Sequence, residues 1–333
     1  MKVKLCKIAD IMTGTTPSMK VDEYYDSNDI PFIKPDSFKS QFQLEASSFI
    51  SNKAERKARV VYENCILVTC IGIIGKVGIT SQKVAFNQQI NSLNIKPYYD
   101  IEYIAYNLLF NKDRLQRISN SAVVPLINKT QFSNFEILIN KDIVIQREIR
   151  NRLNLLSSII NNNKKKLLLL EDIIKSRFVE MFGDITERGR FKVKRWKDIL
   201  DILNGKDYKN VLVNKGGYPV YGSGGIIARA NDYICPSGTI IIGRKGSINN
   251  PILVNEKFWN VDTAFGIVPK ETINTNYLFY FCKQYNFNHL NKATTLPSLT
   301  KRDLLEIEIN IPDLEKQVSF SRFVDQINKL KFA

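Results

Sequence analysis

The sequence predicts an α+β fold in which two similar domains alternate with two helices, the first of them unusually long. One ordered set of strand, glycine and proline motifs occurs twice in the 333 residues. A stretch without proline or glycine separates the two copies, and a shorter helical stretch follows the second. We therefore expect a first domain over residues 1–141, a central long helix over 142–182, a second domain over 183–311 and a short distal helix over 312–333.

Near the start of each predicted domain a similar segment, Leu5–Ile11 and Trp196–Ile202, leads to a turn with glycine, at Gly14 and at Gly205. In each, a β-branched strand then enters a glycine loop, Ile66–Cys70 before Gly72–Gly78 and Thr239–Ile242 before Gly243–Ser247. Helices are expected at Tyr103–Ile118 and Thr275–Tyr285. Pairing Pro125 with Pro297 aligns Lys129 with Lys301 and Phe132 with Leu304, ahead of strands at Phe135–Ile139 and Ile307–Ile311. Short strands mixed with helices make each domain an α+β unit.

The central helix carries a coiled-coil pattern. Its seam follows alternating spacings of four and three through Ile149, Leu153, Leu156, Ile160, Asn163, Leu167, Leu170, Ile174 and Met181, with Arg177 in the one gap. Asn163 either sets the register of a buried seam or faces solvent. About 40 helical residues extend roughly 60 Å, so this helix needs a partner helix. The distal helix, with a stripe of Phe320, Val324 and Ile327, supplies part of one and is about half as long.

The composition favours a polyanionic partner. The formal charge is +15 and the pI is near 9.4, and by count both domains are basic, about +5 for residues 1–141 and about +6 for 183–311. Nucleic acid is the first candidate, an anionic membrane the second, and a generally Lys-rich proteome the neutral alternative. We find no signal peptide and no apolar run of the roughly 20 residues that span a bilayer. Five cysteines without a C-x-x-C pair, and one histidine, argue against zinc and for a reducing compartment, the cytoplasm.

Enzyme motifs are missing from the sequence. There is no Asn-Pro-Pro or Asp-Pro-Pro methyltransferase tetrapeptide, and Gly75-Lys76 lacks the spacing of a phosphate-binding loop. The lone His289 suits a surface or packing role better than catalysis. These absences favour a chain without a catalytic centre, metal or cofactor. The alternatives are a self-contained DNA methyltransferase or endonuclease, and a coiled-coil scaffold that does not bind DNA.

With these motifs in place, the whole chain resembles the DNA-specificity subunits of Type I restriction-modification systems. The residues that carry the resemblance are Lys4–Pro17, Tyr218–Gly225, the two glycine loops, Leu170–Gly183 at the end of the central helix, and Pro312–Gln317. The resemblance implies two target-recognition domains, each reading one half-site of a split sequence in double-stranded DNA. It also implies that the two long helices pack antiparallel as a spacer and dock the modification subunits.

The same resemblance assigns the chemistry to partners. Modification subunits bind S-adenosylmethionine and methylate adenine, and a separate motor-nuclease subunit cuts, so this chain directs catalysis without performing it. Adenine methylation requires base flipping, which the reader assists by holding the duplex. One departure from the family is the expected short distal helix, where members usually have one comparable to the central helix.

Candidate DNA contacts are chosen by residue type. Phosphates require Lys or Arg, and base edges favour amides and guanidiniums. The phosphate candidates lie in the glycine loops and in the paired segments near the end of each domain, and the base-reading candidates lie near strand ends. The nominated residues are Lys76, Arg244, Lys245, Lys129, Lys301 and Arg302 for phosphates, and Lys34, Gln88, Gln89, Arg229, Tyr221 and Ser223 for the groove surface. Solvated turns for the cations, and strand packing for Tyr221, are the structural alternatives.

Overall fold

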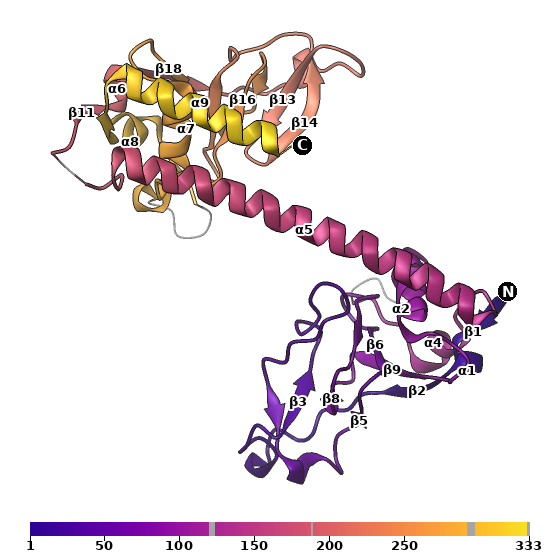
Figure 1. The fold of residues 1–333 in the computed structure, drawn as a ribbon. Helices are drawn as coiled ribbons and strands as arrows, with labels where there is room; N and C mark the ends of the chain where they lie inside the picture. The colour runs from indigo at the N-terminus through magenta and orange to yellow at the C-terminus, as the bar shows by residue number, and fades with distance from the viewer. Residues whose placement is uncertain (120–123, 188, 292–296, 332–333) are drawn as a thin grey trace. The chain divides into compact units, whose positions relative to one another are not determined.

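The structure is a computed structural model that describes residues 1–119, 124–187, 189–291 and 297–331. It divides into two compact units, Met1–Asn162 and Asn163–Ala333 (Figure 1). Each unit is described by itself. Within the described residues, no helix is both long and apolar enough to cross a membrane.

Unit 1 combines three small sheets with flanking helices. A four-stranded antiparallel sheet has the order β2-β9-β6-β7, and β1 pairs with β10. A second four-stranded sheet has the order β4-β3-β8-β5 and is mixed, because β3 and β8 pair in parallel. The strands are β1 (Lys2–Lys4), β2 (Ala9–Thr13), β3 (Ile30–Ile33), β4 (Phe49–Ile50), β5 (Val60–Val61), β6 (Ile66–Thr69), β7 (Val77–Ile79), β8 (Val84–Phe86), β9 (Ile90–Ile95) and β10 (Glu136–Leu138). The helices are α1 (Leu5–Ile8), α2 (Ile101–Phe110), α3 (Lys112–Arg117), α4 (Lys129–Asn134) and the start of α5 (Ile143–Phe182), with 3-10 turns at Asp22–Tyr24 and Asn52–Ala54.

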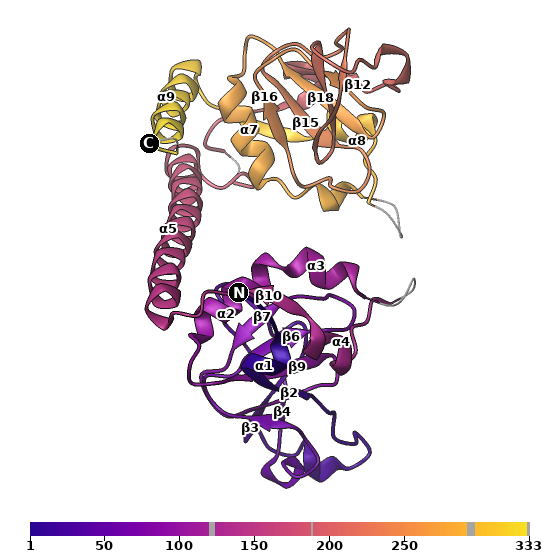
Figure 2. The same cartoon turned by 90° about the vertical axis from the view of Figure 1, so that its right-hand side faces the viewer.

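Unit 2 has the same plan. A four-stranded sheet has the order β12-β18-β15-β16, a three-stranded sheet has the order β14-β13-β17, and β11 pairs with β19. The strands are β11 (Lys192–Arg195), β12 (Leu200–Asn204), β13 (Tyr218–Gly222), β14 (Gly225–Ala230), β15 (Thr239–Gly243), β16 (Ile252–Val254), β17 (Trp259–Asn260), β18 (Ala264–Pro269) and β19 (Glu308–Ile311). The helices are the end of α5, α6 (Trp196–Ile199), α7 (Thr275–Gln284), α8 (Lys301–Leu305) and α9 (Leu314–Leu330), with 3-10 turns at Lys209–Val211 and Phe287–Leu290. Figure 2 shows this sheet beside α7 and α8.

The internal repeat is confirmed by hydrogen bonds at matching places. Gly72 N donates to Pro125 O and Gly246 N donates to Pro297 O, at 2.9 and 3.0 Å. Two residues after each proline, Ile127 N donates to Cys70 O and Leu299 N donates to Arg244 O, each at 2.9 Å. The proline pairing inferred from the sequence is therefore structural. Residues 122–123 and 293–296 of the same matched phrases lie outside the described residues.

The expected helix at Tyr103–Ile118 is wrong in detail. It is divided at Asn111 into α2 and α3. Asn111 is buried, with φ −92° and ψ 12°, and its Nδ2 donates to Asn107 O at 2.8 Å. The side chain competes for the backbone of the preceding turn, which is how asparagine interrupts helices.

In unit 2, the end of α5 packs antiparallel against α9. The Phe178 and Phe320 rings lie 5.5 Å apart, and further along, Glu171 forms an ion pair with Lys331. From the first of these contacts to the second, the residue number falls on α5 and rises on α9, so the two helices run in opposite directions. The shared core contains the expected stripe of α9, namely Phe320, Val324 and Ile327.

The seam inferred for α5 is buried in part, and only its course beyond Ile174 is wrong. Leu170 and Ile174 are buried as expected, but the face then continues through Phe178 and Phe182 instead of Arg177 and Met181. Leu156, Ile160, Asn163 and Leu167 are exposed, and Ile149 and Leu153 are half-buried. The buried residues at the end of α5 follow a spacing of four, because this part of the helix packs on the core of unit 2 as well as on α9. Over these residues the buried surface is the apolar face of an ordinary amphipathic helix.

Candidate nucleic-acid interface

In unit 1, one end of the β2-β9-β6-β7 sheet gathers four loops. Thr15 N donates to Phe86 O at 3.0 Å, and Cys70 N donates to Gln89 O at 2.7 Å. Ile127 N, two residues before Lys129, bonds Cys70 O. We call these loops, residues 14–16, 70–76, 86–89 and 125–129, the first loop cluster.

In unit 2, the matching loops meet in the same way. Lys206 N donates to Asn260 O at 3.0 Å, and Arg244 N donates to Thr263 O at 2.8 Å. The backbones of Lys245 and Ser298 form an isolated antiparallel β-bridge, and Val261 N donates to Tyr221 O. We call residues 205–206, 222–227, 243–247, 260–263 and 297–301 the second loop cluster.

Glycine is required where these loops touch. A Cβ on Gly14 would lie 2.1 Å from Asn87 O, and a Cβ on Gly205 would lie 1.9 Å from Val261 O. Contacts that close are sterically impossible, so only glycine allows the first turn of each domain to lie on the strand-end loop. The glycines matched in the sequence thus hold equivalent loops together.

Most nominated residues of unit 1 lie in the first loop cluster or beside it. Lys76 Nζ donates to Pro35 O at 2.7 Å, which brings it next to Lys34. The exposed Gln88 accepts from Thr16 Oγ1 at 2.5 Å, and Gln89 Oε1 accepts from Asn87 Nδ2 at 2.9 Å. Lys129 is exposed at the first position of α4. Amides and cations therefore share one end of the unit.

The nominees of unit 2 are more divided. Arg244, Lys245, Lys301 and Arg302 are exposed, but Lys301 Nζ already donates to Ile202 O at 2.7 Å. Ser223 lies in the β13–β14 turn of the cluster. Tyr221 packs edge-on against Phe258, with centroids 5.3 Å apart, and burial raises its pKa. Arg229 binds Gly217 O at 3.1 Å, away from the cluster.

Two details of the sequence interpretation change. Lys76 and the Arg244–Lys245 pair lie in matching loops but not at matching positions, because the hydrogen bonds pair Cys70 with Arg244. The sequence also contained an unnominated cation, Lys206, directly after the Asn204-Gly205 turn. Its hydrogen bond to Asn260 O makes it the counterpart of Thr15.

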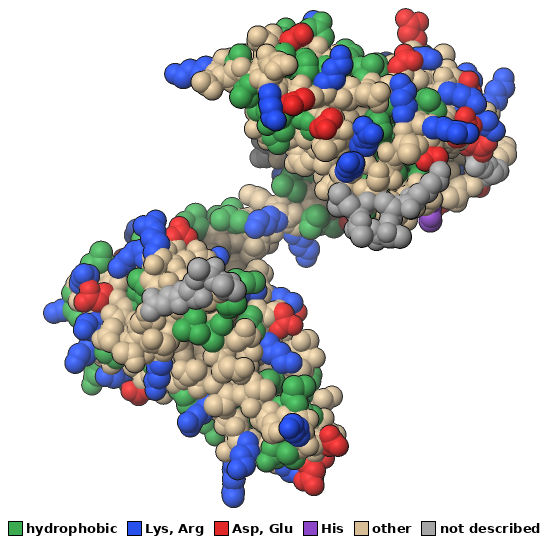
Figure 3. All heavy atoms as spheres, turned by 180° about the vertical axis from the view of Figure 1, so that it is seen from behind, with side chains coloured by type: hydrophobic (Ala, Val, Ile, Leu, Met, Phe, Trp, Pro, Cys, Tyr) green, Lys and Arg blue, Asp and Glu red, His purple; other side chains and the backbone are tan. Residues whose placement is uncertain are grey.

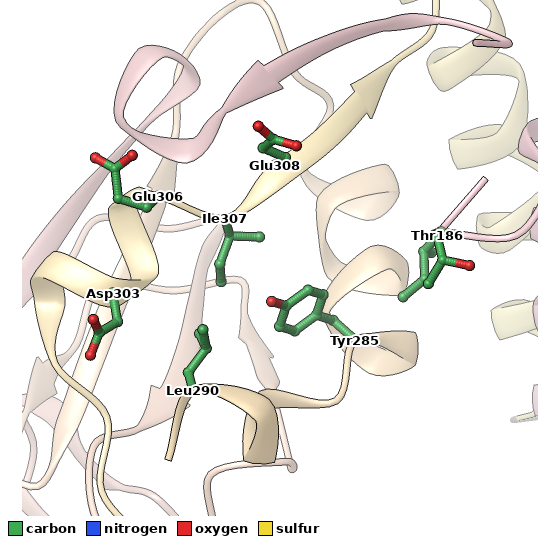
Figure 4. A pocket seen from close by; sticks show the side chains of 8 residues that line it. Thr186, Tyr285, Leu290, Asp303, Glu306, Ile307 and Glu308 are labelled. Atoms are coloured by element: carbon green, nitrogen blue, oxygen red, sulfur yellow. The ribbon is translucent and has the colours of Figure 1, made fainter. Parts of the chain in front are cut away.

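A hollow elsewhere in unit 2 has the opposite charge. Figure 4 shows Tyr285, Leu290 and Ile307 facing it, with Asp303, Glu306 and Glu308 around them. The Lys197 ammonium, 3.0 Å from Glu306, holds the pKa of that carboxyl below its usual range. Carboxylates repel phosphates, so this hollow is unsuited to DNA. Figure 3 shows Lys and Arg side chains over one face of each unit, with fewer Asp and Glu.

The fold and the matching loop clusters define a class of protein with two homologous α+β domains in tandem, each joined to a helix. The family model described as Type I restriction modification DNA specificity domain matches the chain at residues 1–171 and again at 189–333. The chain therefore belongs to this family.

Curated relatives extend over nearly the whole chain. The EcoprrI type I restriction enzyme specificity subunit of Escherichia coli is 23% identical over 98% of this chain and 87% of the relative. The MjaVIII specificity subunit of Methanocaldococcus jannaschii is 24% identical over 98% and 86%. Among solved structures, the S subunit of a Type I system from M. genitalium aligns over 99% of this chain and 91% of its own, with a TM-score of 0.63 and 15% identity. A chain from a type I restriction-modification complex aligns with a TM-score of 0.52 and 13% identity, over 99% and 90%.

Proposed function

We propose that this chain is the non-catalytic DNA-specificity subunit of a Type I restriction-modification complex. Each unit reads one half-site of a bipartite target in double-stranded DNA through its loop cluster. The observation that carries the proposal is the duplication of one basic loop cluster, built on equivalent hydrogen bonds in both units. Two readers on one chain suit a target of two parts.

The partners follow from this role. A modification subunit supplies S-adenosylmethionine and the methyl transfer to adenine, and a motor-nuclease subunit supplies cleavage, so this chain itself needs no cofactor. The exposed apolar residues of α5, among them Leu168 and Leu169, are the proposed docking surface for modification subunits. A complex that acts on host and incoming DNA belongs in the cytoplasm.

The test is to co-express the chain with its modification subunit and map N6-methyladenine over the host genome by single-molecule sequencing. We expect a methylated motif with two defined parts and an undefined spacer, present only with this chain. A control lacks the chain but keeps the modification subunit. If both subunits are produced and stably associated and no new motif is methylated, the proposal is wrong.

A self-contained methyltransferase is the second candidate class. It predicts that the purified chain alone binds S-adenosylmethionine in calorimetry, whereas the proposed role predicts that only the complex does.

A further inference from the structure

The hairpin of β13 and β14 in unit 2 exposes two consecutive isoleucines. Ile226 is 57% exposed and Ile227 is 55% exposed. Neighbouring side chains on a strand ordinarily point to opposite faces of the sheet, so one of two adjacent residues is usually covered. Here both remain in solvent, on strands joined by the two-residue turn Ser223–Gly224.

A β-bulge causes this exposure. The pairing shifts between Val220, which pairs with Ala228, and Tyr221, which pairs with Ile226. Ile227 therefore has no partner on β13 and is the extra residue. A bulge bends the strand and redirects its side chains, and bulges are common beside functional sites.

The hairpin belongs to the second loop cluster. A Cβ built on Gly243 would lie 3.1 Å from Ser223 Cβ, so the hairpin turn rests on the strand end that leads into Arg244 and Lys245. A Cβ on Gly222 would lie 3.7 Å from Ile227 Cγ2 and 3.8 Å from Val261 Cγ2. The isoleucines thus adjoin the loops nominated for phosphate contact.

The charges around the hairpin identify its occupant. Lys206, Arg244 and Lys245 are exposed, and within the described part of the chain none of the three forms an ion pair. Exposed cations in the loops beside the hairpin suit the phosphates of a duplex. The two exposed isoleucines of the hairpin suit base faces or thymine methyl groups in a groove. Double-stranded DNA has both features, because its phosphates are anionic and its bases offer apolar faces and methyl groups.

We infer that Ile226 and Ile227 contact the bases of the half-site that unit 2 reads and help to determine its sequence. The inference rests on the proposed function and deepens it by assigning base discrimination to an apolar pair. The cations beside the pair supply affinity that does not depend on sequence.

The test is the double substitution Ile226→Ser with Ile227→Ser, in the chain co-expressed with its modification subunit, with N6-methyladenine mapped over the genome. We expect one half of the wild-type motif to lose definition or change while the other half persists, and methylation of the original sites to fall about tenfold. The matched control is Val193→Ser, at a residue 41% exposed on β11 of the same unit, which leaves the motif unchanged. Ile226→Val with Ile227→Val keeps both side chains apolar and is expected to preserve methylation.

A second measurement separates this role from phosphate binding. The serine variant removes no charge, so binding of the complex to random-sequence duplex keeps the wild-type salt dependence. An unchanged two-part motif at wild-type methylation levels in the serine variant overturns the inference and leaves the proposed function intact. Absence of any motif with the wild-type chain overturns the proposed function, and the inference with it.

Discussion

Two buried glutamines at matching positions attach each helix to its domain. Gln146 Oε1 accepts from Asp100 N and Gln317 Oε1 accepts from Asn274 N, both at 2.8 Å. Their Nε2 atoms donate to Asn140 O and Pro312 O, both at 2.7 Å. Each glutamine satisfies one backbone donor and one acceptor that burial removes from water. The same amide clamp therefore closes both copies of the repeat.

Gln317→Ala is expected to lower the free energy of unfolding of the chain by about 1–3 kcal/mol, because Asn274 N and Pro312 O lose their partner. Urea denaturation followed by circular dichroism measures the change. The control is Gln326→Ala, on the exposed side of α9, where a change within about 0.5 kcal/mol is expected. Equal effects of the two substitutions would contradict the clamp.

Thiol reactivity is expected to separate the five cysteines by burial. Cys6 is exposed and the other four are buried. Burial raises the pKa of Cys65, Cys70 and Cys235 to about 12 and also raises that of Cys282. The thiolate is the nucleophile, so a raised pKa leaves these thiols protonated and unreactive at pH 8.

Iodoacetamide at pH 8, read by mass spectrometry of peptides, should label Cys6 alone in the native chain and all five cysteines in urea. Labelling of Cys70 as fast as Cys6 in the native chain would show that the β6 end of the first sheet is open to solvent.

Matching the two copies of the repeat in the sequence predicted which backbone segments are equivalent, but not which groups the lysine side chains contact. Proline fixes its own φ angle, and only glycine allows a close backbone approach, so Pro125 with Pro297 and Gly14 with Gly205 were found by spacing alone. A lysine has a long flexible stem, and its direction depends on which carbonyl lies within reach. Lys301 turns to Ile202 O and Lys76 to Pro35 O, contacts that depend on segments far away in the sequence.

At the scale of elements, the antiparallel pair of α5 and α9 stabilises unit 2 through an aromatic cluster. Phe178 lies 5.0 Å from Phe182 and 5.5 Å from Phe320, measured between ring centroids. Phe178→Ala and Phe320→Ala are each expected to cost about 3–5 kcal/mol of unfolding free energy. Because the rings touch, the double variant should cost less than the sum.

A double-mutant cycle by urea denaturation checks this coupling. Additive losses would mean that the two rings contribute independently of their contact. Leu168→Ala is the control, since that side chain is 68% exposed and the isolated chain should change by less than about 0.5 kcal/mol.

The central helix also shows why the sequence predicted its existence but not its buried face. A stretch of this length without proline or glycine is helical by default, and α5 indeed covers Ile143–Phe182. Leucine and isoleucine occur on several sides of it, so a seam of period 3.5 could be traced through residues that the structure leaves exposed. The choice of face depends on the domain core and α9, which lie far along the chain.

The exposed residues of α5 provide a separate test of docking. Leu168→Asp is expected to leave the stability of the isolated chain nearly unchanged and to weaken association with the modification subunit, because a charge enters an apolar interface. Co-purification from cells measures the association. Asn162→Asp adds the same single negative charge at an exposed position on another face of α5 and is the control. Equal retention by wild type and both variants would place the docking surface elsewhere.

At the scale of the whole molecule, the effect of the net charge of +15 on DNA binding depends on which residues carry the charge. Phosphate contacts release counterions, so each contact contributes about 0.9 to the slope of log K against log salt concentration. Arg244→Gln with Lys245→Gln is expected to reduce this slope by about 2 in the assembled complex with duplex DNA, measured by fluorescence anisotropy. The slope should not vanish, because the first loop cluster keeps its own cations.

The decisive comparison removes the same charge from another part of unit 2. Lys192→Gln with Lys194→Gln, both exposed on β11, changes the net charge equally. These lysines lie outside the second loop cluster, because β11 comes before α6 and the start of β12, whereas the cluster begins where β12 ends. If placement matters, this variant keeps the wild-type slope. If both pairs reduce the slope alike, DNA is attracted by total charge rather than held at the loop cluster, and the assignment of half-site contact to Arg244 and Lys245 is wrong.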